Sequence, residues 1–180
     1  MLIQNIHKPA INILYNMGHH RCNISLVVAI FISVLHLSRA QPQFEGKGNS
    51  KDDYVNQHNC IRRVLNLPPL VWDDKVAERA QAWANKRTDC AMIHSEGGGE
   101  NLASGHDLSG LWAVQLWIDE RLDYDYSKNE CTAMCGHYTQ VVWKNTTKVG
   151  CGKSRCTDGK SNMIVCNYDP PGNYIGEYPY

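Results

Sequence analysis

The chain has 180 residues, with 18 lysines and arginines against 18 aspartates and glutamates and a formal net charge of zero. This length suits one domain with a core of its own and is short for two. Without a basic excess, the composition excludes a protein that binds nucleic acid through a basic face.

An apolar stretch near the N-terminus runs from Ile24 to Leu37 and leads into Ser38-Arg39-Ala40. It is shorter than the roughly 20 residues that span a bilayer, and its small-x-small ending is typical of a signal cleavage site. We therefore expect residues 1–40 to be a secretory signal peptide, with a membrane anchor as the alternative. Translation from Met17 would leave only a short polar segment before the apolar core, so Met17 is the alternative start.

The cysteine content indicates an oxidising compartment. Eight cysteines in a secreted chain of this size predict a disulfide framework rather than a zinc site. Cys22 and three basic residues would leave with the signal peptide, so the mature chain has 15 basic against 18 acidic residues and a charge of −3. The seven that remain are an odd number: Cys60, Cys90, Cys131, Cys135, Cys151, Cys156 and Cys166.

Residues 41–50 contain proline and two glycines and are expected to form a flexible mature N-terminus, followed by a single domain over 51–180 that includes a C-terminal tail. A first helix must end before Pro68-Pro69, because residues ahead of proline disfavour the α conformation. Its apolar positions recur every three or four residues, at Tyr54, Val55, His58, Ile61 and Leu65.

A second helix is expected to begin at Asp73 or Asp74, either of which can cap it. Lys86 and Arg87 suit its C-terminal end, where cations interact favourably with the helix dipole. Its apolar stripe consists of Val76, Ala77, Ala80, Trp83 and Ala84.

Three further segments are interpreted as strands or loops. Cys90 to His94 resembles a short strand, and Gly97-Gly98-Gly99 a loop with unusual backbone angles. From His137 to Trp143, the residues His137, Thr139, Val141 and Trp143 alternate with Tyr138, Gln140 and Val142, and Met163 to Tyr168 is rich in apolar residues, so both segments are expected to be strands. We expect a sheet covered by helices.

A third helix is expected from about Ser109 to Leu122. Trp112, Leu116 and Glu120 are four residues apart and share one face of it. A carboxylate beside two large apolar side chains needs a partner, so Glu120 is a candidate functional residue.

Two long motifs follow in the second half of the chain. One is Gly136-His137-Tyr138-Thr139-Gln140-Val141-Val142-Trp143, and the other runs from Cys166-Asn167-Tyr168-Asp169 through Pro170-Pro171-Gly172-Asn173-Tyr174. With the segment from His94 to Ala103 upstream, they resemble the signatures of the CAP superfamily: cysteine-rich secretory proteins, insect antigen 5 and plant pathogenesis-related proteins. The resemblance covers roughly residues 50 to 180, and the Pro-Tyr ending is similar to the plant class-one pathogenesis-related branch.

The resemblance implies an α+β fold, a three-layer α-β-α sandwich stapled by disulfides. The family pattern would pair Cys90–Cys156, Cys131–Cys135 and Cys151–Cys166, whereas the sequence alone permits 15 pairings of six cysteines. The loop between Cys131 and Cys135 is shorter than the family pattern implies. Cys60 is left over, either as a small buried apolar residue that stays reduced or as an intermolecular thiol.

His94, Glu100, Glu120 and His137 match the four positions of the family's cleft tetrad. Two imidazoles and two carboxylates could hold zinc or another divalent cation, since imidazole ligates zinc and carboxylates ligate it or orient the imidazoles. They could equally hold one another as a hydrogen-bonded polar cluster. No cofactor is expected to be required.

Enzyme mechanisms are not favoured by the spacing. None of the histidines has the H-E-x-x-H spacing of a metalloprotease. Ser95 could combine with His137 and with Glu100 or Glu120, but the chain lacks a G-x-S-x-G elbow. We therefore predict a protein without catalytic activity.

The plant branch implies a secreted apoplastic defence protein, without a transmembrane segment and monomeric, that binds a sterol or another lipid. Inhibition of oomycete or fungal growth would follow from sterol sequestration. Tyr124 and Tyr126 are candidates for the sterol groove, with a place in the core or on the surface as the alternative.

A second function is implied by the last motif, which resembles the precursor of a released defence-signalling peptide read by a receptor. Cleavage after Asp169 would release Pro170 to Tyr180, a segment whose proline and glycine content predicts an irregular and accessible tail. The alternative is a tail packed on the domain. Asn145-Thr146-Thr147 is a glycosylation sequon.

Overall fold

The computed structural model describes residues 48–180. The predicted signal peptide, Met17, Cys22 and the segment 41–47 lie outside the described residues. The elements are α1 Lys51–Val64, β1 Val71–Trp72, α2 Asp74–Lys86, β2 Glu100–His106, α3 Gly110–Asp119, the 3-10 helix η1 Glu120–Asp123, β3 Tyr124–Asp125, β4 Glu130–Cys131, α4 Gly136–Val141, β5 Lys148–Arg155 and β6 Ser161–Asp169.

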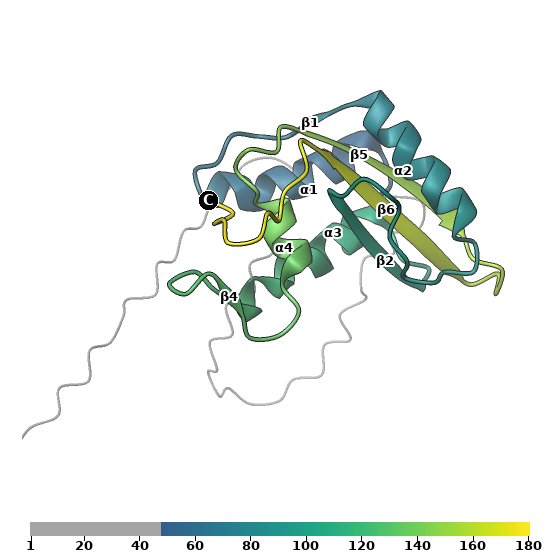
Figure 1. Cartoon of the computed structure of the whole chain (residues 1–180). Coiled ribbons are helices and arrows are strands. Elements are labelled where there is room, and N and C mark those ends of the chain that lie inside the picture. Colours follow the sequence, from purple (N-terminus) through teal and green to yellow (C-terminus); the bar gives the residue numbers. More distant parts are fainter. Residues whose placement is uncertain (1–47) are drawn as a thin grey trace, which may run out of the picture. The chain divides into compact units, whose positions relative to one another are not determined.

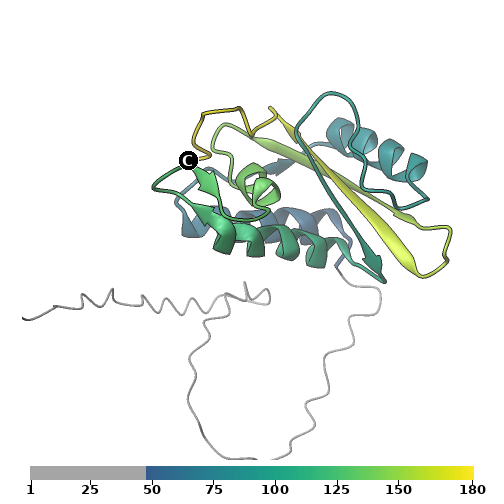
Figure 2. The ribbon, with the colours of Figure 1, turned by 60° about the horizontal axis from the view of Figure 1, so that its bottom comes forward.

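Four strands form one sheet in the order β1-β5-β6-β2, and β3 pairs with β4 in a separate hairpin. β1 runs parallel to β5, while β5 and β2 both run antiparallel to β6. Helix α2 covers one face of this sheet, and α1, α3 and α4 lie on the other (Figures 1 and 2). The expected three-layer α-β-α sandwich is confirmed.

Two glycines of β5 allow α2 to pack directly on the sheet. A Cβ at Gly150 would lie 2.1 Å from the main-chain nitrogen of Ala77, and one at Gly152 would lie 2.4 Å from the Cα of Gln81. Small residues on the facing helix complete the contact, because Ala80 is fully buried between helix and sheet. The glycines also weaken the β-strand signal of this segment, which is why the sequence did not predict β5.

The first helix begins and ends where the spacing predicts. Ser50 caps it: its hydroxyl accepts from the amide of Asp53 at 3.1 Å, and its own amide donates to the Asp53 carboxylate at 2.9 Å. The carbonyl of Gly48 accepts from the amide of Leu111 at 2.8 Å. The last residues of the segment expected to be flexible, 48–50, are therefore bonded to both α1 and α3.

The expected strand from His137 to Trp143 is wrong, since Gly136–Val141 forms helix α4. Every residue from 138 to 143 is buried, so the segment shows neither helical nor strand periodicity. The carbonyls at the C-terminal end of this helix are hydrogen-bonded by Arg62 of α1, which is fully buried. Nη1 of Arg62 donates to the carbonyls of Val141 at 3.0 Å and Trp143 at 2.9 Å. Burial lowers the pKa of Arg62 to about 10, so the guanidinium stays charged at neutral pH.

The expected strand from Cys90 to His94 is also wrong, because this segment has no regular secondary structure. Cys90 has a φ of 56°, and the carbonyl of Ile93 accepts from the indole nitrogen of Trp83 at 2.9 Å instead of joining a ladder. The second helix begins at Asp74, with Asp73 as its cap. The third ends as an α-helix at Asp119 and continues as η1.

Six cysteines form the three pairs that the resemblance implies, Cys90–Cys156, Cys131–Cys135 and Cys151–Cys166. Cys60 is disulfide-bonded as well, so the expectation that it stays reduced is wrong. Because the other six described cysteines pair with one another, none of them is the partner of Cys60.

Candidate functional site

The first His–Glu pair lies where β2 begins. Oε1 of Glu100 accepts from Nδ1 of His94 at 2.9 Å and from the amide of Ser95 at 2.8 Å. Its Oε2 accepts from the hydroxyl of Ser95 at 2.5 Å and from Nδ2 of Asn167 at 3.2 Å. The carboxylate thus has four donors, and it is buried although the imidazole is largely exposed.

The second pair lies where α3 passes into η1. Oε1 of Glu120 accepts from Nδ1 of His137 at 2.6 Å, and Oε2 accepts from the amides of His137 at 3.0 Å and Tyr138 at 3.3 Å. These amides belong to the first turn of α4, whose orphan N–H groups favour an anion. The His137 ring stacks on Trp117 with ring centroids 6.2 Å apart.

A buried chain of hydrogen bonds fixes the main chain at His137. Nδ2 of Asn101 donates to the carbonyl of His137 at 3.0 Å and to the hydroxyl of Tyr168 at 3.1 Å. That hydroxyl lies 2.8 Å from Nε2 of His58, whose Nδ1 donates to the carbonyl of Tyr54 at 2.8 Å. His58 is therefore the neutral Nδ1–H tautomer, with Tyr168 as the donor to Nε2.

Burial sets the protonation of this chain. The pKa of His58 is lowered to about 4, chiefly by desolvation; the hydrogen bond to the Tyr54 carbonyl opposes this shift, and the nearby charge of Arg62 contributes to it. Desolvation also raises the pKa of Tyr168 well above its usual value. Both side chains are uncharged at neutral pH, which matches the donor and acceptor roles above.

All four tetrad residues take part in these contacts, as two separate His–Glu pairs. Each imidazole uses Nδ1 for its carboxylate and keeps Nε2 for another partner, an arrangement in which the carboxylates orient the imidazoles. Between residues 48 and 180, no group of three or more histidine, cysteine, aspartate or glutamate side chains is placed to hold a metal ion. The arrangement does not fit a preassembled zinc centre, and zinc binding by the tetrad remains a prediction.

Ser95 does not have the geometry of an activated nucleophile. Its hydroxyl donates to Glu100, whereas a catalytic serine needs a histidine that accepts its proton. His137 is bonded to Glu120 instead. The serine-hydrolase alternative therefore has no support in these contacts.

The other candidate residues have different surroundings. Tyr124 and Tyr126, candidates for a sterol groove, contact other tyrosines, including Tyr178 and Tyr180 of the C-terminal segment. Asn145 is exposed in the turn before β5, so the sequon is accessible. Asp169 and Pro170, the predicted cleavage site, lie at the end of β6.

The predicted cleavage site is bonded on both sides. The carbonyl of Asp169 accepts from the amide of Thr147 at 3.1 Å, and the carbonyl of Pro170 accepts from the hydroxyl of Thr146 at 2.9 Å. The tail after it has no helix or strand, as expected. Its hydrogen bonds to the domain agree with the alternative interpretation, a tail packed on the domain.

Sequence reasoning missed the residues that support the pairs: Asn101, Asn167, Tyr168, Trp117 and His58. The first three lie inside the motifs quoted above, and their membership of these motifs is the signal that could have identified them. His58 was predicted on the buried face of the first helix, but its bond to Tyr168 joins residues that are remote in the chain, and so does the stacking of Trp117 on His137.

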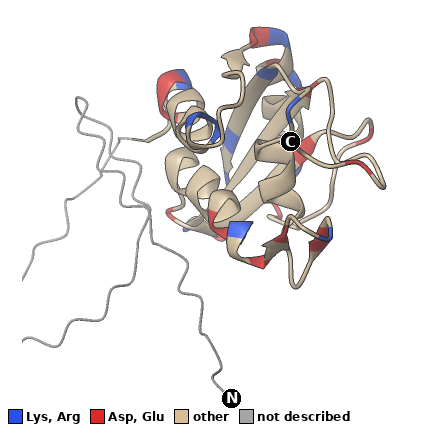
Figure 3. Ribbon diagram, turned by 90° about the vertical axis from the view of Figure 1, so that its left-hand side faces the viewer, with Lys and Arg blue, Asp and Glu red and all other residues tan. Residues whose placement is uncertain are grey.

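The described surface shows no single charged face. Acidic and basic residues are interspersed along the ribbon in Figure 3. Within residues 48–180, none of the helices is long and apolar enough to cross a membrane.

Comparisons with known proteins agree with these features. A model of the cysteine-rich secretory protein family matches residues 55–168. The chain is 46% identical over 168 residues to pathogenesis-related leaf protein 4 of Solanum lycopersicum, covering 91% of this chain and 100% of the relative. It is 50% identical over 135 residues to pathogenesis-related protein 1 of Arabidopsis thaliana, covering 73% of this chain and 83% of the relative.

Among solved structures, venom allergen-like protein 4 of Schistosoma mansoni has a TM-score of 0.63 and 28% identity, covering 75% of this chain and 94% of the other. The fold, the disulfides, the two motifs and the relatives agree. The chain therefore belongs to the cysteine-rich secretory protein family, within its branch of plant pathogenesis-related proteins.

Proposed function

We propose that the chain is a secreted, non-catalytic defence protein that binds a sterol or a related lipid and thereby inhibits oomycete or fungal growth. The plant relatives are pathogenesis-related proteins by name. Three disulfides suit an extracellular protein. Sterol sequestration would starve microbes that depend on external sterol.

Exposed apolar side chains beside both His–Glu pairs carry this proposal. Met92 and Ile93 directly precede His94 and are 51% and 54% exposed. Leu116 and Trp112, one and two turns before Glu120 on one face of α3, are 44% and 55% exposed. Covering such side chains with a lipid would contribute on the order of 1 kcal/mol or more each, and exposed apolar groups of this kind favour a binding role.

Sterol binding by the purified mature chain tests the proposal. We expect saturable binding of a fluorescent sterol, and at least tenfold weaker binding by the double variant Trp112→Ser, Leu116→Ser. A matched control is Val64→Ser, Val71→Ser, which removes two side chains that are 54% and 56% exposed on α1 and β1. This control should bind sterol within about twofold of the wild type.

Growth of a sterol-dependent oomycete provides the functional readout. The protein should inhibit growth, and an excess of sterol should relieve the inhibition. Equal weakening of sterol binding by both double variants, or inhibition that persists under sterol excess, contradicts sequestration.

The C-terminal segment favours a second candidate function, release of Pro170 to Tyr180 as a signalling peptide for a receptor. All three disulfides within the described chain join residues before Asp169, so cleavage there would leave every one of them in the remaining domain. Residues 173–178 are exposed. Mass spectrometry of extracellular fluid should detect the free peptide, with less of it from Asp169→Ala; its absence where the parent protein is abundant contradicts release.

A further inference from the structure

The C-terminal segment is most enclosed at its very end. Residues 173–178 are exposed, with Ile175 wholly so, whereas Pro179 is buried and Tyr180 is half-buried. A loosely attached tail would show the opposite gradient, with exposure rising toward the last residue. The last two residues therefore bind the domain at the end of an exposed connection.

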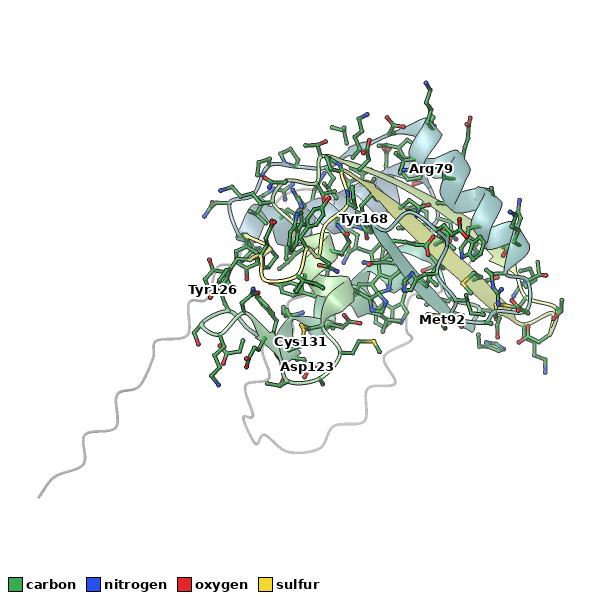
Figure 4. All side chains as sticks on the ribbon, in the orientation of Figure 1. Arg79, Met92, Asp123, Tyr126, Cys131 and Tyr168 are labelled. Carbon is green, nitrogen blue, oxygen red and sulfur yellow. A yellow bond between two sulfur atoms is a disulfide. The ribbon has the colours of Figure 1, made fainter. Side chains whose placement is uncertain are left out.

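Tyrosine side chains from two different elements receive Tyr180. Tyr126 lies on the connection between β3 and β4 (Figure 4). Its ring stacks on the Tyr180 ring with centroids 5.0 Å apart. The Tyr126 hydroxyl donates to the main-chain oxygen of Tyr180 at 2.7 Å. The hydroxyl of Tyr138, on α4, lies 3.1 Å from the Tyr180 hydroxyl, so both the ring and its polar tip have partners.

Main-chain contacts extend this recognition to the preceding residues. The amide of Lys144 donates to the carbonyl of Pro179 at 2.6 Å, and Nδ2 of Asn129 donates to the carbonyl of Glu177 at 3.0 Å. The Tyr178 ring meets the Tyr126 ring edge-on, with centroids 5.4 Å apart. Stacked and edge-on aromatic pairs of this kind stabilise a contact beyond the effect of their buried area.

Contacts that do not involve the tail hold the receiving residues in place. Oδ1 of Asn129 accepts from the hydroxyl of Tyr124 at 2.7 Å, which directs the amide nitrogen toward the tail. The hairpin itself pairs Tyr124 with Cys131, and Cys131 is joined to Cys135 at the start of α4. The surface is thus preorganised, as a ligand site would be.

We propose that the β3–β4 hairpin and α4 form a peptide-binding site for a tyrosine-x-tyrosine segment with proline in its middle position, occupied here by Tyr178 to Tyr180 as a tethered ligand. The site accepts the same sequence from a separate molecule when the chain's own tail is displaced. The inference concerns the surface at Tyr126 and Tyr138, whereas lipid binding is proposed at the exposed apolar side chains beside the His–Glu pairs, and it does not require cleavage after Asp169. If cleavage occurs, the released segment remains bound until it dissociates from this site.

The test uses the full chain with its own tail disabled. In the double variant Tyr178→Ala, Tyr180→Ala the tail keeps its length and loses the two rings that fill the site. A fluorescent synthetic peptide with the sequence of residues 170–180 should bind this variant saturably. It should bind the wild type at least tenfold more weakly, because the tethered tail competes at a high effective concentration.

Two controls give the result its specificity. A peptide with both tyrosines replaced by alanine should not bind, and adding Tyr126→Ala to the double variant should weaken binding of the unchanged peptide at least tenfold. A variant that unfolds would be recognised by its thermal melting curve. No saturable binding by a folded double variant up to about 1 mM peptide overturns the proposal.

Hydrogen exchange at Lys144 tests the seated tail without any added peptide. The amide of Lys144 donates to Pro179, so Tyr180→Ala should accelerate its exchange at least tenfold. Ile175→Ala, which removes a fully exposed side chain of the same segment, should leave the rate unchanged. Equal exchange in the wild type and Tyr180→Ala would show that the tail is not seated, and would also overturn the proposal.

Discussion

The two His–Glu pairs have the same chemistry and opposite construction. In the first, the Glu100 side chain is 1% exposed and the His94 side chain 57%. In the second, Glu120 and His137 are enclosed alike, at 17% and 18%. The first is a buried carboxylate with an imidazole attached to its outside, and the second is a half-buried pair closed by Trp117.

The difference shows which member of each pair supports the fold. Glu100 has three donors besides His94, so its position does not depend on the imidazole. Glu120 has two further donors, and both are amides of the first turn of α4, where His137 itself resides. Helix α4 and the second pair are therefore expected to form or to fail together, whereas the first pair can lose its histidine.

Glu100→Ala should produce the largest effect. It leaves the amide and hydroxyl of Ser95 and the amide of Asn167 without their acceptor, and we expect a loss of roughly 3–5 kcal/mol in the free energy of unfolding. Urea denaturation followed by tryptophan fluorescence measures it. Glu100→Gln keeps one acceptor oxygen and should lose less; a loss for Glu100→Ala as small as that for His94→Ala would contradict the comparison.

His58 sharpens the comparison, because it is a buried histidine without a carboxylate. Burial holds its pKa near 4 in the folded protein, against 6.5 for the ordinary side chain. Since the unfolded chain binds more protons between these values, the stabilisation is complete above about pH 6.5 and decreases as the pH falls to about 4. The loss should approach about 3 kcal/mol.

Chemical denaturation at pH 7, 5.5 and 4.5 measures this dependence. The groups that face His58 are the Tyr54 carbonyl, the Tyr168 hydroxyl and the Arg62 guanidinium, and none of them changes charge in this range. His58→Gln keeps a donor and an acceptor and should flatten the pH profile. An unchanged slope in this variant would mean that other groups produce it.

The two tetrad histidines should differ by a smaller amount. His137→Ala removes the stacking on Trp117 and the 2.6 Å hydrogen bond to Glu120, and should cost roughly 1–2 kcal/mol. His94→Ala removes one bond from a carboxylate that keeps three, at a largely exposed ring, and should cost less than about 0.5 kcal/mol. Thermal melting of both variants measures the two losses of stability. Equal losses would mean that the two pairs contribute alike.

Helices with local signals could be predicted from the sequence. The first ends before Pro68, and the second begins after the cap Asp73; both signals lie close in the chain to the helix that they bound. The motifs identified the four tetrad residues and implied the three disulfide pairs. They did so by resemblance, since 15 pairings of the six cysteines were open to the sequence alone.

Other features depend on residues that are distant in the chain. The last four residues of helix α4, 138–141, are all buried, and its end is hydrogen-bonded by Arg62, which lies more than 70 residues earlier, so its own residues show no period. The segment from Cys90 to His94 has strand-like composition, yet its polar groups bond to Trp83 and Glu100 rather than to a neighbouring strand.

The sequence by itself determined the helix boundaries with local caps and the chemistry of the tetrad, because short-range contacts and residue types are written directly in the chain. Only the tertiary structure decided that the tetrad divides into two pairs and that Pro179 and Tyr180 bind the hairpin. A proline- and glycine-rich tail has no periodicity of its own. Its conformation is selected by the tyrosines at 126 and 138, whose positions exist only after the domain has folded.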